Sequence, residues 1–163
     1  MKRKLVFLFL IALIAGSSVF ADAGKPIKQK AVFGYCQTSN NGSVEGWIID
    51  SEGNVKTQER DKPLGKIDKV FLDEKRRLIK ALVGGPYSER KGSEGKEGLR
   101  KIYFCYCNSF FGLKRRKIIL KESGDFTQIN NNENAKDIIS WLEGIESGIE
   151  QIKQLEKRVT NTK

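Results

Sequence analysis

The chain is organised around one stretch, Lys101-Ile102-Tyr103-Phe104-Cys105-Tyr106-Cys107-Asn108-Ser109-Phe110-Phe111. It is the densest run of aromatic and β-prone residues in the sequence. Successive side chains of a β-strand point to opposite faces, which predicts that Cys105 and Cys107 share one face. The opposite face then carries Ile102, Phe104 and Tyr106. Because apolar residues occupy both faces, we expect a central strand that is covered on both sides.

The segments around this strand predict two antiparallel β-meanders. Runs rich in β-branched and aromatic residues alternate with turns that contain glycine and asparagine, at the spacing of hairpins. The runs lie at residues 31–38, 44–49 and 54–57 in the first meander and at residues 101–111, 118–120 and 126–129 in the second. The sequence therefore predicts an antiparallel sheet of about five or six strands.

A long C-terminal helix is predicted over residues 134–159. Its apolar residues recur at spacings of three and four and form one narrow stripe. The stripe consists of Ile138, Leu142, Ile145, Ile149, Ile152, Leu155 and Val159. We expect the helix to pack on the sheet. In the alternative, its C-terminal half projects and the stripe over residues 138–159 mediates self-association.

A second helix is predicted at residues 66–83, where Gly84-Gly85-Pro86 provides a stop signal, although the same residues also suit a hairpin. Residues 87–98 are rich in glycine and charge and predict a mobile surface loop. The fold class expected is α+β, with a single domain over residues 31–160. Residues 24–30 are expected to be a flexible lead-in and residues 161–163 a frayed tail.

Residues 1–23 have the three parts of a secretory signal peptide. Basic residues at positions 2–4 precede an apolar run at 5–15, and small residues favour cleavage after Ala21 or Ala23. The apolar run is shorter than the roughly 20 residues of a membrane-spanning helix. We therefore expect a soluble protein that is secreted or periplasmic and has no transmembrane segment after cleavage.

Composition limits the function. The net charge is +10, and it becomes +8 after cleavage at Ala23, because three cations and one carboxylate leave with the signal peptide. A basic protein favours anionic partners, whereas export disfavours nucleic acid. The chain contains no histidine, which excludes Ser-His-Asp and Cys-His catalysis and histidine-based zinc sites. Because we find no nucleotide, haem, flavin or metal motif, we expect no cofactor.

Three cysteines, Cys36, Cys105 and Cys107, follow the signal segment. A disulfide is the default in an oxidising compartment. A bridge between Cys105 and Cys107 would be strained, because side chains two residues apart on a strand lie too far apart. We therefore expect Cys36 to pair with Cys105 or Cys107, which closes a loop of about 70 residues and stabilises the fold by about 4 kcal/mol.

The strongest basic cluster is Lys114-Arg115-Arg116-Lys117, which follows Phe110 and Phe111. Such a cluster more often protects an edge strand from aggregation. The alternative is a surface for an anionic partner, in which the cations lie beside an aromatic floor. A smaller run, Lys75-Arg76-Arg77, is expected to be a solvated face, with a dedicated anion site as its alternative.

These observations favour an exported, non-enzymatic binding module that contacts a protein or an anionic envelope polymer. One alternative is a thiol or soft-metal protein, because three thiolates could hold Cu(I) through Cys36, Cys105 and Cys107. The other alternative is a carboxylate-based hydrolase. Its candidate residues are Asp50, Glu52, Asp73 and Glu122, which lie in expected turns without a recognisable acid/base arrangement.

Overall fold

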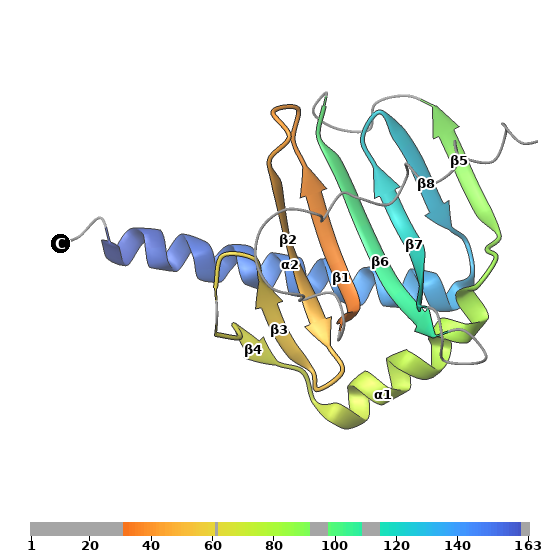
Figure 1. The fold of residues 1–163 in the computed structure, drawn as a ribbon, viewed down its shortest axis with the longest axis horizontal. Coiled ribbons are helices and arrows are strands. Elements are labelled where there is room, and N and C mark those ends of the chain that lie inside the picture. Colours follow the sequence, from red (N-terminus) through yellow and green to blue (C-terminus); the bar gives the residue numbers. More distant parts are fainter. Residues whose placement is uncertain (1–30, 61, 92–97, 109–114, 161–163) are drawn as a thin grey trace, which may run out of the picture.

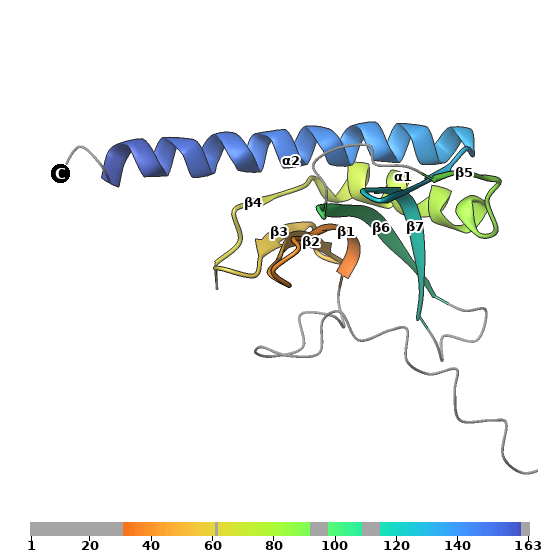
Figure 2. The ribbon, with the colours of Figure 1, turned by 90° about the horizontal axis from the view of Figure 1, so that it is seen from above.

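The computed structural model describes residues 31–60, 62–91, 98–108 and 115–160. The described elements, in chain order, are β1 (Ala31–Thr38), β2 (Val44–Asp50), β3 (Asn54–Thr57), β4 (Gly65–Lys66), α1 (Lys69–Leu78), the 3-10 helix η2 (Ile79–Leu82), β5 (Tyr87–Lys91), β6 (Arg100–Asn108), β7 (Arg115–Ser123), β8 (Phe126–Asn130) and α2 (Glu133–Thr160). The eight strands form one antiparallel sheet in the order β4-β3-β2-β1-β6-β7-β8-β5. Helix α2 lies across one face of this sheet (Figures 1 and 2). The predicted α+β class is confirmed.

The predicted central strand, β6, lies between β1 and β7 in the middle of the sheet. Cys105 stands opposite Phe33 on one side and Ile118 on the other, and it is fully buried in the core beneath α2. We call this covered side the inner face. Ile102 and Phe104 pack with other residues in a separate cluster on the outer face. The alternation expected from the sequence is therefore confirmed for the described part of the strand.

The two expected meanders correspond to β1-β2-β3 and β6-β7-β8, and the sheet has a further strand at each edge. One of these, β5, corrects the expectation that residues 87–98 form a loop throughout. It pairs with β8 from Tyr87 opposite Asn130 to Lys91 opposite Phe126. Its sequence, YSERK, has no alternating apolar pattern. It can still form a strand, because backbone hydrogen bonds to the neighbouring strand hold an edge strand without burial of its side chains. Residues 92–97 lie outside the described residues.

Most of residues 66–83 is helical, in α1 and η2, and is not a hairpin, although Lys66 is the last residue of β4. Asp68 caps α1, because its carboxylate accepts hydrogen bonds from the backbone N–H groups of Val70 at 2.9 Å and Phe71 at 3.1 Å. Leu72 and Leu82 anchor α1 and η2 in the core of the inner face, where both side chains are fully buried. Arg76, Arg77 and Lys80 are exposed, as expected for a solvated face. Lys75 is not, because its ammonium lies over the Phe71 ring at 5.2 Å and pairs with Asp137 of α2 at 2.5 Å.

Helix α2 begins after Asn132, whose side chain accepts a hydrogen bond from the backbone N–H of Asn134 at 3.0 Å. Its first half packs on the sheet as expected, with Ile138 and Leu142 fully buried. Its C-terminal part, beyond the buried Ile149, extends past the sheet (Figure 2). The exposed fractions there are 37 % for Ile152, 60 % for Leu155 and 65 % for Val159.

The expected signal peptide and lead-in at residues 1–30, and the expected tail at residues 161–163, lie outside the described residues. Among the residues that the structure describes, no helix combines the length and the apolar character that crossing a membrane requires.

Candidate functional site

Two basic clusters that are far apart in the sequence meet at one end of the sheet. Arg76 and Arg77 in α1, Lys80 in η2 and Arg115 at the start of β7 line one cavity of about 600 Å³. The cavity lies where β1 begins and β6 ends, close to α1 at the lower edge of the sheet in Figure 1. We call it the cationic basin, and we define it by these four residues.

Positive charge dominates the basin. Asp73 is the one carboxylate among the described residues that line it, and it contacts Arg76 at 3.2 Å. Both partners of this ion pair are about two-fifths exposed, so the pair is weak. Arg77 and Lys80 form no ion pair with any described residue. The basin therefore attracts anions, and two of its cations have no competing carboxylate in the described part of the chain.

Interactions with β1 and β6 hold Arg115 in place. Its guanidinium donates a hydrogen bond to the backbone carbonyl of Ala31, and its central carbon lies 4.7 Å from the centroid of the Tyr106 ring. A cation over an aromatic face is attracted by the ring quadrupole. Strands β1 and β6 thus hold the guanidinium at the rim of the basin. Because this side chain is already ordered, binding a ligand carries a smaller entropic cost.

The structure divides the basic cluster that the sequence singled out. Arg115 lines the basin, whereas the ammonium of Lys117 lies 4.2 Å from the centroid of the Phe104 ring on the outer face. Arg116, which stands opposite Cys107, is exposed. The remaining residues of the expected surface, Phe110, Phe111 and Lys114, lie outside the described residues. The aromatic partners of the described cations are therefore Tyr106 and Phe104.

The expected disulfide is not formed, and all three cysteines are free. Cys36 stands directly opposite Ile102 across β1 and β6, so it shares the outer face with Ile102. Cys105 and Cys107 follow Ile102 by three and five positions. Because side chains alternate along a strand, both cysteines lie on the opposite, inner face. A disulfide needs Cβ atoms that point toward each other, which the intervening sheet prevents.

The three thiols differ in burial, and we therefore expect them to differ in reactivity. Burial, with a smaller contribution from Cys107, raises the pKa of Cys105 to about 12. Burial likewise raises the pKa of Cys36. Cys107 is half-buried and lines the cationic basin. Within the described ranges, no group of three cysteine, histidine, aspartate or glutamate side chains is arranged to hold a metal ion, and the three sulfurs are not brought together.

The carboxylates considered for a hydrolase are engaged in the fold. Asp50 contacts the ammonium of Lys56 at 2.9 Å, and Glu122 accepts a hydrogen bond from Arg100 at 2.6 Å. Burial acts to raise the pKa of Asp50, but hydrogen bonds from Lys56, Asn54 and backbone N–H groups outweigh it and lower the pKa. Asp73 is paired with Arg76 in the basin, and Glu52 is exposed in the turn between β2 and β3.

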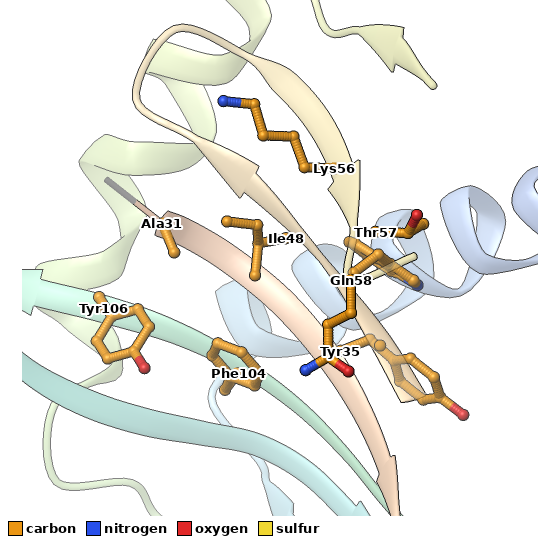
Figure 3. Close-up of a pocket in the computed structure, with 10 residues that line it drawn as sticks. Ala31, Tyr35, Ile48, Lys56, Thr57, Gln58, Phe104 and Tyr106 are labelled. Carbon is orange, nitrogen blue, oxygen red and sulfur yellow. The ribbon is translucent and has the colours of Figure 1, made fainter. Parts of the chain in front are cut away.

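A small apolar hollow lies on the outer face of the sheet. Figure 3 shows Ile48 of β2 and Phe104 and Tyr106 of β6 projecting toward it, with Lys56 at one side. Phe104 can lie close to β1 because Gly34 has no side chain, and a Cβ there would be 2.7 Å from the Phe104 ring. The hollow measures about 70 Å³, well below the roughly 300 Å³ of the smallest ligand pockets.

A second large cavity, of about 420 Å³, lies at the opposite end of the inner face, between α2 and strands β1, β2, β3 and β6. Trp47, Thr57, Glu146 and Glu150 are among the residues that line it. Sequence reasoning missed this cavity, because it depends on how α2 packs against four strands, which no local pattern contains. The spacing of four residues between Glu146 and Glu150 is the one signal that marks a shared helix face.

Comparison with known proteins finds no family model, no curated protein and no solved structure that matches this chain.

Proposed function

We propose that this protein is a non-enzymatic module that binds an anionic polymer of the cell envelope in the cationic basin. The observation that carries the proposal is the convergence of Arg76, Arg77, Lys80 and Arg115 on one cavity with a single described carboxylate, Asp73. These residues come from three separate elements, so the fold rather than a local run of basic residues creates the positive field.

An extended ligand with repeated negative charges fits this surface better than a single small anion. The basin is open and large, and the positive charge continues along β7 to Lys117 on the outer face. Export, as the signal-like residues 1–23 predict, would bring the protein to the anionic polymers of the envelope. The non-enzymatic part of the proposal is supported by the lack of histidine and by the engaged carboxylates.

The test is a titration of the purified, processed protein with polygalacturonate and with polyphosphate, with dextran as the neutral control polymer. We expect binding to both anionic polymers, no binding to dextran, and weaker binding as the salt concentration rises. The double charge reversal Arg77→Glu/Lys80→Glu is expected to weaken binding by about tenfold or more, equivalent to about 1.4 kcal/mol.

The matched control is Lys157→Glu/Arg158→Glu, which makes the same change in net charge in the last turn of α2, away from the basin (Figure 1). It should retain most of the affinity. Equal losses in the two variants would show that net charge alone drives binding, and the basin would have no special role. If the protein binds neither polymer but captures an acidic envelope protein, the proposed polymer ligand is wrong and the partner is a protein.

A further inference from the structure

The cationic basin concentrates positive charge in one place. Its described lining has four cations and one carboxylate, which leaves an excess of three positive charges. Arg77 and Lys80 form no ion pair with any described residue, and the pair between Asp73 and Arg76 is partly exposed and therefore weak. An anionic group with two negative charges interacts with this field about twice as strongly as a group with one.

Part of the basin lining is apolar and buried. Val32 of β1 and Ile79 of η2 line the basin, and both belong to the core of the inner face. Walls of low dielectric constant focus the field of the charges that line a cleft. The four cations therefore act more strongly on an anion here than they would on a flat, fully solvated surface, and the basin discriminates between anions by their charge.

Hydrogen-bond donors line the basin on two sides. The helical side carries Arg76 and Arg77 of α1 and Lys80 of η2, and the side of the sheet carries Asn108 at the end of β6 and Arg115 at the start of β7. Each guanidinium has five N–H donors in a rigid fork, and the Asn108 amide adds neutral donors. A carboxylate offers two oxygens in one plane, whereas a phosphomonoester offers three oxygens in a tetrahedral arrangement. Donors on two sides suit the tetrahedral group better than the planar one.

We propose that the cationic basin selects phosphomonoester groups over carboxylates and phosphodiesters. A phosphomonoester carries close to two negative charges at neutral pH, because its second pKa is about 6, whereas each of the other two groups carries one. The selection follows from the excess of positive charge, the apolar part of the lining and the donors on two sides. The inference rests on the proposed function, since it names the anionic group that the bound envelope polymer presents to the same site.

The ligand rather than the protein is expected to control the pH dependence of this binding. The titratable groups that face the basin, besides its four cations, are Asp73 of α1 and Tyr106 and Cys107 of β6. None of them is a histidine, the side chain whose ordinary pKa lies between about pH 5 and 8, and the chain contains no histidine. We expect the dianion to bind about tenfold more tightly than the monoanion, so the affinity for a phosphomonoester should rise about fivefold between about pH 5 and about pH 7.5. The affinities for a carboxylate and a phosphodiester should stay nearly constant over this range.

The test is an NMR titration of the ¹⁵N-labelled, processed protein with three small anions of similar skeleton. They are α-glycerophosphate, which is a phosphomonoester, glycerophosphoglycerol, which is a phosphodiester, and glycerate, which is a carboxylate, with glycerol as the neutral control. Small ligands separate the contribution of one anionic group from the multivalency of a polymer. The backbone amides of Ser51 and Asn108 report on the basin that these residues line, and the indole N–H of Trp47, which lines other cavities, is the reference. We expect α-glycerophosphate to bind about tenfold more tightly than the other two anions at about pH 7.5.

Arg77→Gln removes an exposed cation that forms no ion pair with any described residue, so the variant should stay folded. We expect its affinity for α-glycerophosphate to fall about fivefold at about pH 7.5 and by less at about pH 5, because a dianion loses more Coulomb energy than a monoanion. Arg158→Gln is the matched control, since it makes the same change in net charge in the last turn of α2. It should leave the affinity unchanged at both pH values.

Three results would overturn the proposal. They are equal affinities for the three anions, an affinity for α-glycerophosphate that does not change with pH, and equal effects of Arg77→Gln and Arg158→Gln. If the anionic polymers bind in the basin but the three small anions bind equally, the polymer ligand stands and the phosphomonoester selection is wrong. If α-glycerophosphate binds with the expected pH dependence and neither polymer binds, the selection stands and the polymer ligand is wrong.

Discussion

Trp47 and Thr57 stand directly opposite each other on β2 and β3, and neither the indole N–H nor the hydroxyl has a hydrogen-bond partner among the described residues. An unsatisfied buried polar group destabilises the protein, whereas its replacement by an apolar group of the same shape is close to neutral or stabilising. The Trp47–Thr57 pair is therefore a place where an apolar replacement of the same shape should not weaken the fold.

The stability of the ligand-free protein tests this relationship. We predict that Thr57→Val raises the free energy of unfolding by up to about 1 kcal/mol, because it removes an unsatisfied hydroxyl and keeps the shape of the side chain. Urea unfolding at neutral pH provides the measurement. Thr127→Val should give a gain of the same size, since that hydroxyl is equally unpartnered among the described residues. A loss of stability in Thr57→Val would mean that a hydrogen bond exists there.

Asp50 makes the stability of the fold depend on pH. Its carboxylate accepts hydrogen bonds from the backbone N–H groups of Glu52 and Asn54, each at 3.0 Å, and pairs with Lys56. Because the pKa of Asp50 is lower in the folded protein, its stabilisation is present above the unfolded pKa, about 3.9, and is lost as the pH falls through the folded pKa.

We predict that Asp50→Asn lowers the free energy of unfolding at pH 7 by about 2 kcal/mol, because hydrogen bonds to a charged group are lost. The stability of the variant should also fall less steeply below about pH 4 than that of the unaltered protein. Urea unfolding over a series of pH values measures both effects. Parallel pH curves for the two proteins would contradict the assigned role of Asp50.

Thiol titration tests the placement of the cysteines. We predict that Ellman's reagent modifies Cys107 readily in the native protein, because that side chain is half-exposed. Cys36 and Cys105 should react only after unfolding, since both are buried and burial raises both pKa values. All three thiols should titrate in denaturant without reductant. A single titrating thiol would reveal a disulfide that the described fold does not form.

The expectation of self-association can be tested at the projecting C-terminal part of α2. Its exposed apolar residues are Ile152, Leu155 and Val159. A stable interface buries roughly 800 Å² on each partner, which three partly exposed side chains do not provide. We therefore predict a monomer at micromolar concentration in sedimentation equilibrium, unchanged by Leu155→Lys. A mass that rises with concentration, and that Leu155→Lys returns to the monomer, would contradict this prediction.

The sequence was sufficient to predict the elements whose apolar pattern is strong. The central strand β6 and the long helix α2 were expected within one residue of their observed starts, and the opposite faces of Cys105 and Phe104 followed from alternation. The edge strand β5 could not be predicted in this way, because backbone pairing with β8 needs no apolar side chains. Local pattern thus predicts burial but not backbone partners.

The candidate sites depend on register and on contacts between distant elements, which local patterns do not contain. Arg77 and Arg115 were each recognised as part of a basic cluster, but only the packing of α1 against the sheet end brings them into one cavity. Likewise, the pairing of Cys36 with Ile102 decides that Cys36 faces away from Cys105. A shift of one residue in that register would have reversed the outcome.

The most direct measurement of the proposed function is the salt dependence of affinity for polygalacturonate. If the cationic basin holds the polymer, the logarithm of the affinity falls linearly with the logarithm of the salt concentration, and Arg77→Glu/Lys80→Glu makes that slope shallower. The control Lys157→Glu/Arg158→Glu keeps the slope of the unaltered protein. The same slope in all three proteins, or no binding at low salt, would contradict the account.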